Sequence, residues 1–371
     1  MMATHKRVLM VATSPTTHGG ITAVVRGYRK CRFWKDWHCR WIASHCDGSV
    51  AVKLWFFFRG FVEYFFLLPF YDIVHIHFSE FPSALRKSVF VMLAKLLGKK
   101  IIIHLHTYSP LASIEGKHKK VYRYLFESAD RAIVLSKIWK TSVEQAFGSK
   151  SITGKTCVVY NPCVPCEEEK KENGNTVNQH LLNAIRTFME GRSIILYAGM
   201  VEERKGYGDL LKAFCKLKDT ACGWSLVIAG IGNVEQGKAM AAQLGIANRV
   251  LWTGWIDGAC KQYVFSHADV FCLPSYAEGF PMGVLDAWSY ALPVVTTPVG
   301  GIPDVAEDGK NMLLAQPGDV EGLSRCLSRV ISDESLRERI SIQSRKLAKG
   351  VFALGACDRK INEIYQNLFA K

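Results

Sequence analysis

Short apolar runs alternate with longer helical patterns over the first half of the chain. The runs are rich in Val and Ile and mostly lack apolar–polar alternation, as expected for strands that are buried on both faces. Residues 83–97 and 137–147 show helical patterns between these runs. Strands separated by helices indicate βαβ units and a parallel sheet. The predicted strands are 7–14, 41–44, 72–78, 100–106, 131–136 and 157–161.

The composition changes at about residue 162. Prolines, a run of Glu and Lys over 167–172 and the Asn-Gly-Asn sequence at 173–175 interrupt the pattern, which predicts an interdomain linker. The alternation then restarts, and 319–371 is helical almost throughout. The predicted strands of this half are 194–199, 225–230, 249–254, 270–275 and 293–297, and the predicted helices are 207–217, 234–244, 258–267 and 283–291.

These patterns predict an α/β chain of two Rossmann-like, doubly wound domains that face a central cleft. Such sheets bind ligands beyond the carboxyl ends of their strands. We expect a first domain over 1–165, a linker over 166–188 and a second domain over 189–354. The last helix, about 355–371, is expected to pack back on the first domain.

The stretch 275–287 carries the most informative chemistry. It follows a predicted strand, turns at a glycine and enters a helix, whose N-terminal amides would form a site for phosphate. Glu278 and Asp286 lie eight residues apart, just over two helical turns, so both can face one ligand. Acids beside a pyrophosphate are useful when they bind hydroxyls, such as those of a sugar and a ribose. The residues expected at the helix start are Gly279, Phe280, Pro281 and Met282.

A second stretch places two cations after the first strand of the second half. Arg204 and Lys205 stand between Gly199 and Gly206. Adjacent cations at the carboxyl end of a strand can neutralise a leaving diphosphate.

Two further candidates lie in the first half. Gly19 and Gly20 follow the first strand, where paired glycines let the backbone approach a ligand at a helix start. His104 and His106 end another strand, and strand alternation puts both on one face. His106 is nearer the carboxyl end and is therefore the candidate for a place in the cleft.

Each of these motifs has a plain structural alternative when it is taken alone. Glu278 suits a helix cap and Asp286 a solvated helix position. The two cations suit an ordinary basic loop, the glycines a turn, and a strand histidine a structural role. The order of the motifs along the chain, rather than any single motif, favours a donor site.

In that order the motifs resemble the large retaining glycosyltransferase family 4. The resemblance covers essentially the whole chain and is strongest over 199–314. The residues that carry it are Gly19, Gly20, His106, Asn161, Pro162, Arg204, Lys205, Gly206, Thr253, Gly254, Glu278, Asp286, Gly300, Gly301, Ile302, Pro303 and Asp304.

The resemblance implies a GT-B fold, a UDP- or GDP-linked sugar donor and retention of anomeric configuration. Glu278 would hold sugar hydroxyls, and the amides after it would meet the diphosphate and the sugar. Asp286 would bind the ribose, and Arg204 and Lys205 would stabilise the departing diphosphate. Gly19 and Gly20 would approach the phosphates, and His106 would lie by the sugar and the acceptor.

Two positions depart from the family pattern. The second acid is usually Glu and is Asp286 here, one methylene shorter. The position after Gly199 is often Arg and is Met200 here, so Arg204 is expected to supply the second positive charge.

The charge distribution and an aromatic stretch indicate what kind of partner the first half of the chain contacts. Residues 1–185 hold 26 Lys and Arg against 13 Asp and Glu, whereas the remainder is nearly balanced within a total of +14. A basic first half indicates an anionic partner such as an acidic membrane surface. The aromatic stretch 54–71 contains Arg59, Glu63 and Pro69, so it is expected to form a buried or membrane-docking helix rather than a span.

The cysteine spacing, the first apolar run and the absence of an acidic cluster predict the cellular compartment and the cofactor requirement. Cys163-x-x-Cys166 has no second such pair, so the twelve cysteines suit free thiols in the cytosol. Residues 8–12 are too short for a signal peptide core. With no acidic cluster at a strand end, we expect no required metal or cofactor.

The expected activity is transfer of the sugar to a saccharide or lipid-linked saccharide in cell-surface polysaccharide or glycoconjugate assembly, at the inner face of the membrane. Two alternatives stay open. One is another GT-B enzyme, such as a sugar-nucleotide epimerase, and the other is a non-enzymatic nucleic-acid-binding protein. No nucleic-acid motif accompanies the basic charge, so we expect no nucleic-acid partner.

Overall fold

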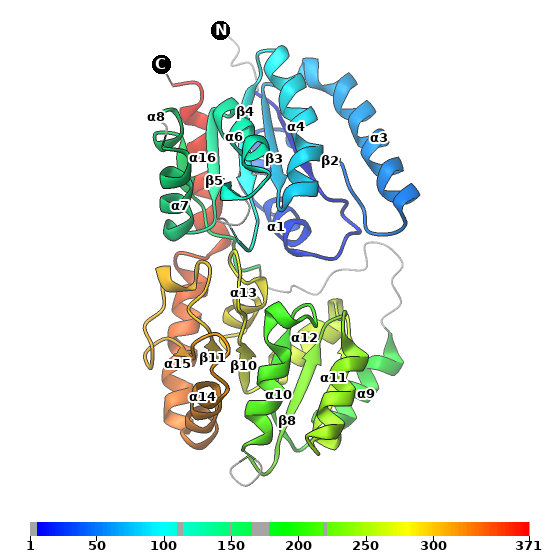
Figure 1. Cartoon of the computed structure of the whole chain (residues 1–371), viewed down its shortest axis with the longest axis vertical. Coiled ribbons are helices and arrows are strands. Elements are labelled where there is room, and N and C mark those ends of the chain that lie inside the picture. Colours follow the sequence, from blue (N-terminus) through cyan, green and yellow to red (C-terminus); the bar gives the residue numbers. More distant parts are fainter. Residues whose placement is uncertain (1–5, 110–113, 149, 165–177, 218–220, 371) are drawn as a thin grey trace. The chain divides into compact units, whose positions relative to one another are not determined.

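The computed structural model describes residues 6–109, 114–148, 150–164, 178–217 and 221–370. The chain divides into two compact units. Unit 1 comprises Met1–Pro162, Glu278–Phe280 and Val351–Lys371, and unit 2 comprises Cys163–Ala277 and Pro281–Gly350. Each contains a six-stranded parallel sheet with helices between the strands (Figure 1), which confirms the predicted α/β class with two doubly wound sheets.

The sheet of unit 1 has the strand order β2-β1-β3-β4-β5-β6. β1 and β3 are buried at every position, which explains why they read as continuous apolar runs. The strand order reverses between β1 and β3, so the loops that follow these strands flank a topological switch point. The strands are β1 (Val8–Ala12), β2 (Arg40–Ala43), β3 (Ile73–Phe78), β4 (Lys100–Leu105), β5 (Arg131–Val134) and β6 (Thr156–Val158).

Helices cover both faces of this sheet. A large apolar core joins one face to residues of α3, α4, α6 and α7, while Tyr28 of α1 and Tyr365 of α16 contact His75 of β3 on the other face. The helices are α1 (Gly20–Tyr28), α2 (Arg32–Asp36), α3 (Val50–Leu67), α4 (Phe81–Leu96), α6 (Lys119–Ser128), α7 (Lys137–Phe147), α8 (Lys150–Thr153) and α16 (Leu354–Asn367).

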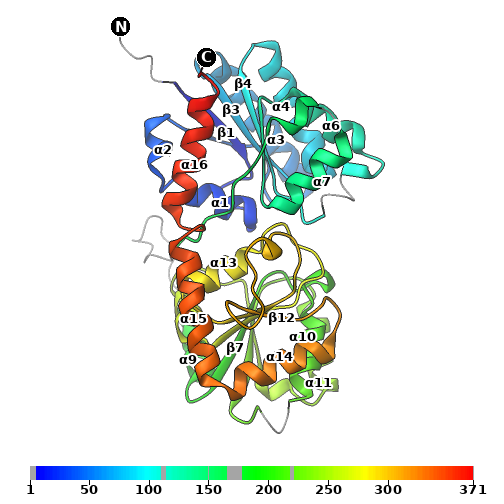
Figure 2. The same ribbon diagram turned by 90° about the vertical axis from the view of Figure 1, so that its left-hand side faces the viewer.

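The C-terminal helix α16 is part of unit 1 although it follows unit 2 in sequence. Figure 2 shows it beside α2 and α1. The Phe33 amide donates to Asp358 Oδ1 at 2.9 Å, and Trp37 Nε1 donates to Asn362 Oδ1 at 2.8 Å. These polar contacts fix the register of the helix against unit 1.

The sheet of unit 2 has the order β12-β11-β10-β7-β8-β9, so its switch point lies between β7 and β10. The strands are β7 (Ser193–Ala198), β8 (Trp224–Ala229), β9 (Val250–Gly254), β10 (Val270–Leu273), β11 (Val294–Thr296) and β12 (Leu313–Leu314). The helices are α9 (Gln179–Met189), α10 (Tyr207–Cys215), α11 (Val234–Gln243), α12 (Gly258–His267), α13 (Met282–Ser289), α14 (Val320–Ser332) and α15 (Glu334–Lys349), with short helices η2 (Glu203–Lys205) and η4 (Ile302–Asp304).

Two features differ from the sequence expectation. The predicted linker 166–188 contains most of helix α9, whose Asn178 side chain caps its first turn at the Leu181 amide and whose Leu182, Ile185 and Met189 are buried. The apolar positions of α9 are interspersed with polar ones, and the helix directly follows a polar stretch. The sequence pattern therefore did not distinguish the helix from the linker. The acidic run at 167–172 and Cys166 lie outside the described residues.

Helix α3 is the second difference. Of its eighteen residues only Gly60 and Tyr64 are buried, so the expectation of a buried helix is wrong. Trp55, Phe58 and Phe66 are more than 60% exposed. Among the described helices, none is long and apolar enough to cross a membrane.

Candidate active site

The switch point of unit 2 holds two of the predicted motifs. Arg204 and Lys205 form η2 after β7, and α13 begins soon after β10. β7 and β10 are adjacent parallel strands, so both loops leave the same edge of the sheet. This is the position at which doubly wound sheets bind their ligands.

Arg204 ties the two loops of unit 2 together. Its Nη1 donates to the Ala277 carbonyl at 2.8 Å, and its Nη2 pairs with Glu202. The Tyr276 amide donates in turn to the Arg204 carbonyl at 2.7 Å. Arg204 therefore orients the segment that leads to Glu278, in addition to any charge that it offers a ligand.

Two glycines allow the backbones in this region to approach closely. A Cβ at Gly206 would lie 2.1 Å from the Pro274 carbonyl oxygen, and the residue has φ +71°. A Cβ at Gly283 would lie 2.6 Å from the Ala198 carbonyl oxygen. The N-terminus of α13, with Pro281 as its cap and Met282 as its first residue, is thereby packed against the end of β7.

Asp286 lies in the second turn of α13 and forms an ion pair with Lys261 of α12. The Nζ–Oδ2 distance is 2.8 Å, and both side chains are between a fifth and a third exposed. Sequence reasoning missed Lys261 because nothing in the spacing links α12 to α13. The predicted ribose acid is thus held in place by a cation.

Glu278, Gly279 and Phe280 group with unit 1. Glu278 is buried, and a Cβ at Gly279 would lie 2.7 Å from the Thr107 carbonyl oxygen. Phe280 packs against Tyr160 and Phe352, with ring centroids 5.9 and 4.9 Å away. This short segment is therefore fixed next to the end of β4.

The helical-spacing argument for Glu278 and Asp286 is wrong. α13 begins only at Met282, with Pro281 as its cap, so Glu278 precedes the helix and the eight-residue separation does not describe two turns. The proposed alternative role of Glu278 as the helix cap is wrong for the same reason.

His106 follows β4 directly, and Thr107 connects it to the Glu278 segment. Its Nε2 lies 2.9 Å from His77 Nδ1, and its ring stacks on His104 with centroids 4.1 Å apart. Burial lowers the pKa of His106 to about 3, so its imidazole is neutral at neutral pH. The contact between the His104 and His106 rings places them on one face of the strand, as strand alternation predicted.

Sequence reasoning missed three neighbours of His106. His75 and His77 repeat on β3 the His-x-His spacing of β4, which was a readable signal. Glu80 follows β3 and accepts hydrogen bonds from Thr107 Oγ1 at 3.1 Å and from the Tyr108 amide at 3.4 Å. Glu80 thereby helps to hold the turn after His106.

Gly19 and Gly20 stand at the start of α1, after β1. Gly19 is the N-cap with φ +157°, and no atom lies within 4 Å of a Cβ built on it. Both glycines are exposed. Their backbone is therefore accessible at the switch point of the unit 1 sheet.

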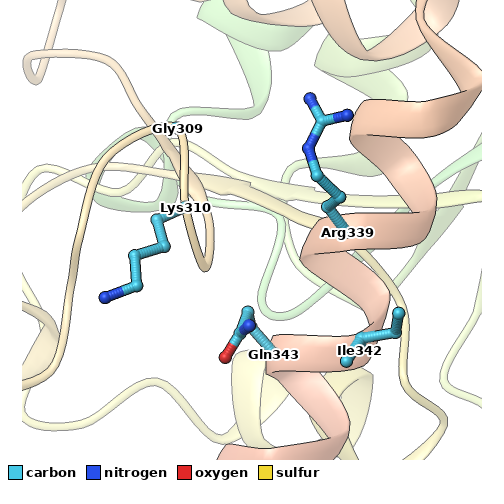
Figure 3. A pocket seen from close by; sticks show the side chains of 5 residues that line it. All are labelled: Gly309, Lys310, Arg339, Ile342 and Gln343. Carbon is cyan, nitrogen blue, oxygen red and sulfur yellow. The ribbon is translucent and has the colours of Figure 1, made fainter.

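A surface hollow of about 250 Å³ lies elsewhere in unit 2. It is lined by Gly309, Lys310, Arg339, Ile342 and Gln343 (Figure 3). None of these residues belongs to a predicted motif, and the hollow is formed by α15 and the loop before β12 rather than by the loops after β7 and β10. It does not contribute to the candidate site.

Comparison with known proteins finds similar glycosyltransferases. Residues 178–347 match the family model described as Glycosyl transferases group 1. The chain is 24% identical over 289 residues to 2-deoxystreptamine N-acetyl-D-glucosaminyltransferase of Niallia circulans, covering 74% of this chain and 71% of that protein. It is 30% identical over 178 residues to the lipopolysaccharide core biosynthesis glycosyltransferase LpsE of Rhizobium meliloti, covering 48% of this chain and 49% of that protein.

A solved structure shares the whole fold. HepE of Anabaena in complex with UDP-glucose superposes with a TM-score of 0.75 at 18% identity, covering 98% of this chain and 100% of that one. Two doubly wound sheets with this likeness define the GT-B fold, as predicted. The likeness of residues 178–347 to glycosyltransferases, together with the curated relatives, indicates that the chain is a transferase enzyme.

Proposed function

We propose that this enzyme is a retaining glycosyltransferase of the family 4 type. It moves a sugar from a UDP- or GDP-linked donor to a saccharide or lipid-linked saccharide acceptor. The transfer serves cell-surface polysaccharide or glycoconjugate biosynthesis. The similar protein LpsE is named for lipopolysaccharide core biosynthesis, which supports this setting.

One observation carries the proposal. Arg204 and Lys205, the N-terminus of α13 and Asp286 belong to the two loops and one helix at the switch point of unit 2. Cations, amides at a helix start and a carboxylate are the groups that recognise a diphosphate and a ribose. Binding of UDP-glucose by HepE, a structure of the same fold, supports this ligand class.

Each residue has a distinct role in donor binding. Lys205 and Arg204 stabilise the departing diphosphate, with the amides at Gly279, Phe280 and Met282 as further donors and Pro281 shaping the turn. Asp286 binds the ribose hydroxyls, and Glu278 binds hydroxyls of the sugar. Gly19 and Gly20 approach the phosphates through their exposed backbone.

The reaction is a front-face substitution through an ion pair. The bond from the anomeric carbon to the diphosphate oxygen breaks, the acceptor oxygen bonds to the same face, and the leaving phosphate oxygen takes the acceptor proton. His106, neutral because burial lowers its pKa to about 3, hydrogen-bonds sugar or acceptor hydroxyls. Positioning and diphosphate stabilisation carry most of the rate.

No metal or other cofactor is required for this step, because Arg204 and Lys205 supply the positive charge. Activity should therefore persist in EDTA. Complete loss of activity in EDTA that Mg²⁺ or Mn²⁺ restores would contradict this assignment.

Stereochemistry tests the proposal without knowledge of the acceptor. Many transferases slowly pass the sugar to water, so proton NMR during incubation with an α-linked UDP- or GDP-sugar identifies the first anomer released. Retention predicts the α anomer before mutarotation. Initial release of the β anomer would overturn the retaining mechanism, and isomerised sugar formed without any acceptor would indicate an epimerase.

Unit 1 carries the features that suit a lipid-linked acceptor at the cytoplasmic face of a membrane. The exposed aromatic side chains of α3 stand beside the exposed cations Lys53 and Arg59. Apolar side chains with neighbouring cations suit an anionic bilayer surface. Further exposed cations are Arg26, Arg29, Lys30, Arg32 and Lys35 of α1, α2 and the turn between them.

A further inference from the structure

Four histidines form a layer on one face of the unit 1 sheet. His75 and His77 alternate along β3, and His104 and His106 continue the layer at the end of β4. His77 and His104 are direct partners in the parallel register. Ring centroids are 4.6 Å apart between His75 and His77 and 4.8 Å apart between His77 and His104.

Two of these rings are held by one nitrogen each. His75 Nδ1 lies 2.8 Å from the Tyr365 hydroxyl, and His77 Nδ1 lies 2.9 Å from His106 Nε2. In each ring the second nitrogen, Nε2, has no hydrogen-bond partner among the described residues. Metal-binding histidines share this arrangement, in which one nitrogen is oriented by a hydrogen bond and the other binds the ion.

His104 completes the group because neither of its ring nitrogens has a hydrogen-bond partner among the described residues. His75, His77 and His104 are all 0% exposed. A buried polar group without a partner destabilises the folded state, and four such nitrogens lie together here. A ligand that satisfies them together explains their clustering.

We propose that His75, His77 and His104 bind a single transition-metal ion of the Zn²⁺ type. One ligand nitrogen from each ring lies within 4.8 Å of the others. Bonds of about 2.0–2.1 Å require nitrogens about 3.4 Å apart, so the rings tilt out of their stack when the ion binds. Three imidazoles select zinc, cobalt, nickel or copper rather than Mg²⁺ or Ca²⁺, which prefer oxygen ligands.

Tyr28 is the side chain that we assign to the fourth position. Its ring lies 5.9 Å from His77, 6.4 Å from His104 and 6.5 Å from His75. Its hydroxyl is buried, and it interacts with the Cys357 thiol of α16. A zinc site with three histidine ligands has a fourth position that an oxygen ligand can take, and we assign the phenol oxygen of Tyr28 to it.

The ion would have a structural role in unit 1. It would join β3, β4 and α1 directly, and it would join α16 through the Tyr365–His75 hydrogen bond. His77 would at the same time hold His106 in one orientation through their shared hydrogen bond. Because the ligands are fully buried, the ion enters as the chain folds.

Metal analysis of the untagged full-length protein tests the proposal. The protein is expressed in zinc-supplemented and in cobalt-supplemented medium and measured by inductively coupled plasma mass spectrometry after dialysis. We expect one ion per chain. Cobalt should show visible absorption of a four-coordinate site without the near-ultraviolet charge-transfer band of thiolate ligands, which separates this site from the twelve cysteines.

Variants locate the ion. His104→Gln and His75→Gln should lose the metal, and His267→Gln, an exposed histidine on α12, should retain it. Metal-free wild-type protein after growth in zinc, at less than about a tenth of an ion per chain, would overturn the proposal and leave a neutral histidine layer. Full metal content in His104→Gln would also overturn it. If that variant fails to fold, the wild-type metal content and the cobalt spectrum still decide.

Discussion

Gly279 occupies a place where no side chain fits. A Cβ there would lie 2.7 Å from the Thr107 carbonyl oxygen and 3.2 Å from Leu135 Cδ1. Both obstacles belong to unit 1, and one of them is backbone that cannot rotate away. This glycine therefore determines how near Glu278 lies to the residue that follows His106.

Gly279→Ala should reduce both activity and stability. Displacement of the Glu278 segment is expected to lower donor turnover about 10-fold or more, and the overlap should cost about 1–3 kcal/mol of unfolding free energy. Gly154→Ala is the matched control, because nothing lies within 4 Å of a Cβ at that exposed glycine. Equal turnover in the two variants would show that the close approach is unimportant.

The proposed role of Asp286, which pairs with Lys261, predicts how its variants bind the ribose of the nucleotide. Asp286→Asn should weaken binding of the nucleoside diphosphate about 10-fold, because a charged acceptor for the ribose hydroxyls is lost. The 2′,3′-dideoxy nucleotide should bind wild type and variant alike when measured by calorimetry. Asp286→Glu, the usual residue of the family that the sequence resembles, should restore binding. An unchanged ribose preference in Asp286→Asn would exclude Asp286 from the ribose site.

Lys87 is a buried lysine, 2% exposed, whose Nζ donates to Ser44 Oγ and lies 5.6 Å from the centroid of the Phe90 ring. Burial lowers the pKa of Lys87 well below its usual range. The unfolded chain therefore binds the extra proton, and stability should fall as pH decreases below the unfolded pKa of about 10.4. Urea unfolding of Lys87→Met at pH 7 to 8 should show higher stability and a weaker pH dependence than wild type.

The control for Lys87 is Lys95→Met, which changes an exposed lysine on the same helix. It should leave both the stability and its pH dependence as in wild type. A destabilised Lys87→Met would instead show that the amine makes a necessary polar contact.

At the scale of elements, helix α3 is the surface whose variants test whether the enzyme attaches to a membrane or instead uses an acceptor dissolved in water. Trp55 and Phe58 are 61% and 62% exposed, and each large apolar side chain contributes about 1.5–3 kcal/mol when it leaves water. The double variant Trp55→Ser, Phe58→Ser should therefore bind anionic vesicles at least about 10-fold more weakly in co-sedimentation at low salt.

Ile342→Ser, which removes an exposed apolar residue of unit 2, should bind those vesicles as wild type does. If wild-type protein fails to bind anionic vesicles at low salt, the acceptor is not presented at a membrane through this helix.

The strands were predictable because parallel strands buried on both faces leave dense apolar runs. β1, β3 and β4 follow those runs closely. α9 was hidden because its polar positions continue the polar stretch before it. The environment of α3 was misjudged because an apolar helix reads the same whether its aromatic side chains are covered or exposed.

The candidate site was predictable only in part. Motif order located the loops after β7 and β10, because strand order and loop position follow from sequence. Contacts between residues far apart in the sequence could not be predicted from motif order. The Arg204–Ala277 hydrogen bond, the Lys261–Asp286 ion pair and the His77–His106 hydrogen bond depend on tertiary register, and the helix start at Met282 depends on Pro281.

At the scale of the whole molecule, the two halves of the chain differ in net charge. Unit 2 contains the residues matched to the glycosyltransferase group 1 model almost entirely, and its half of the chain is nearly neutral. The first half holds most of the net positive charge. This division suits an anionic nucleotide bound by a few placed cations and an acceptor approached through a broadly basic surface.

Thermal unfolding of the full chain with about 1 mM UDP-, GDP- or ADP-sugar tests the central claim most directly. Because a ligand that binds only the folded state stabilises it, the UDP- or the GDP-sugar should raise Tm by about 5 °C. The shift should disappear in Lys205→Ala and persist in Lys212→Ala, which changes an exposed lysine of α10. No shift with any nucleotide sugar, or an equal shift in Lys205→Ala, would contradict the proposed donor site.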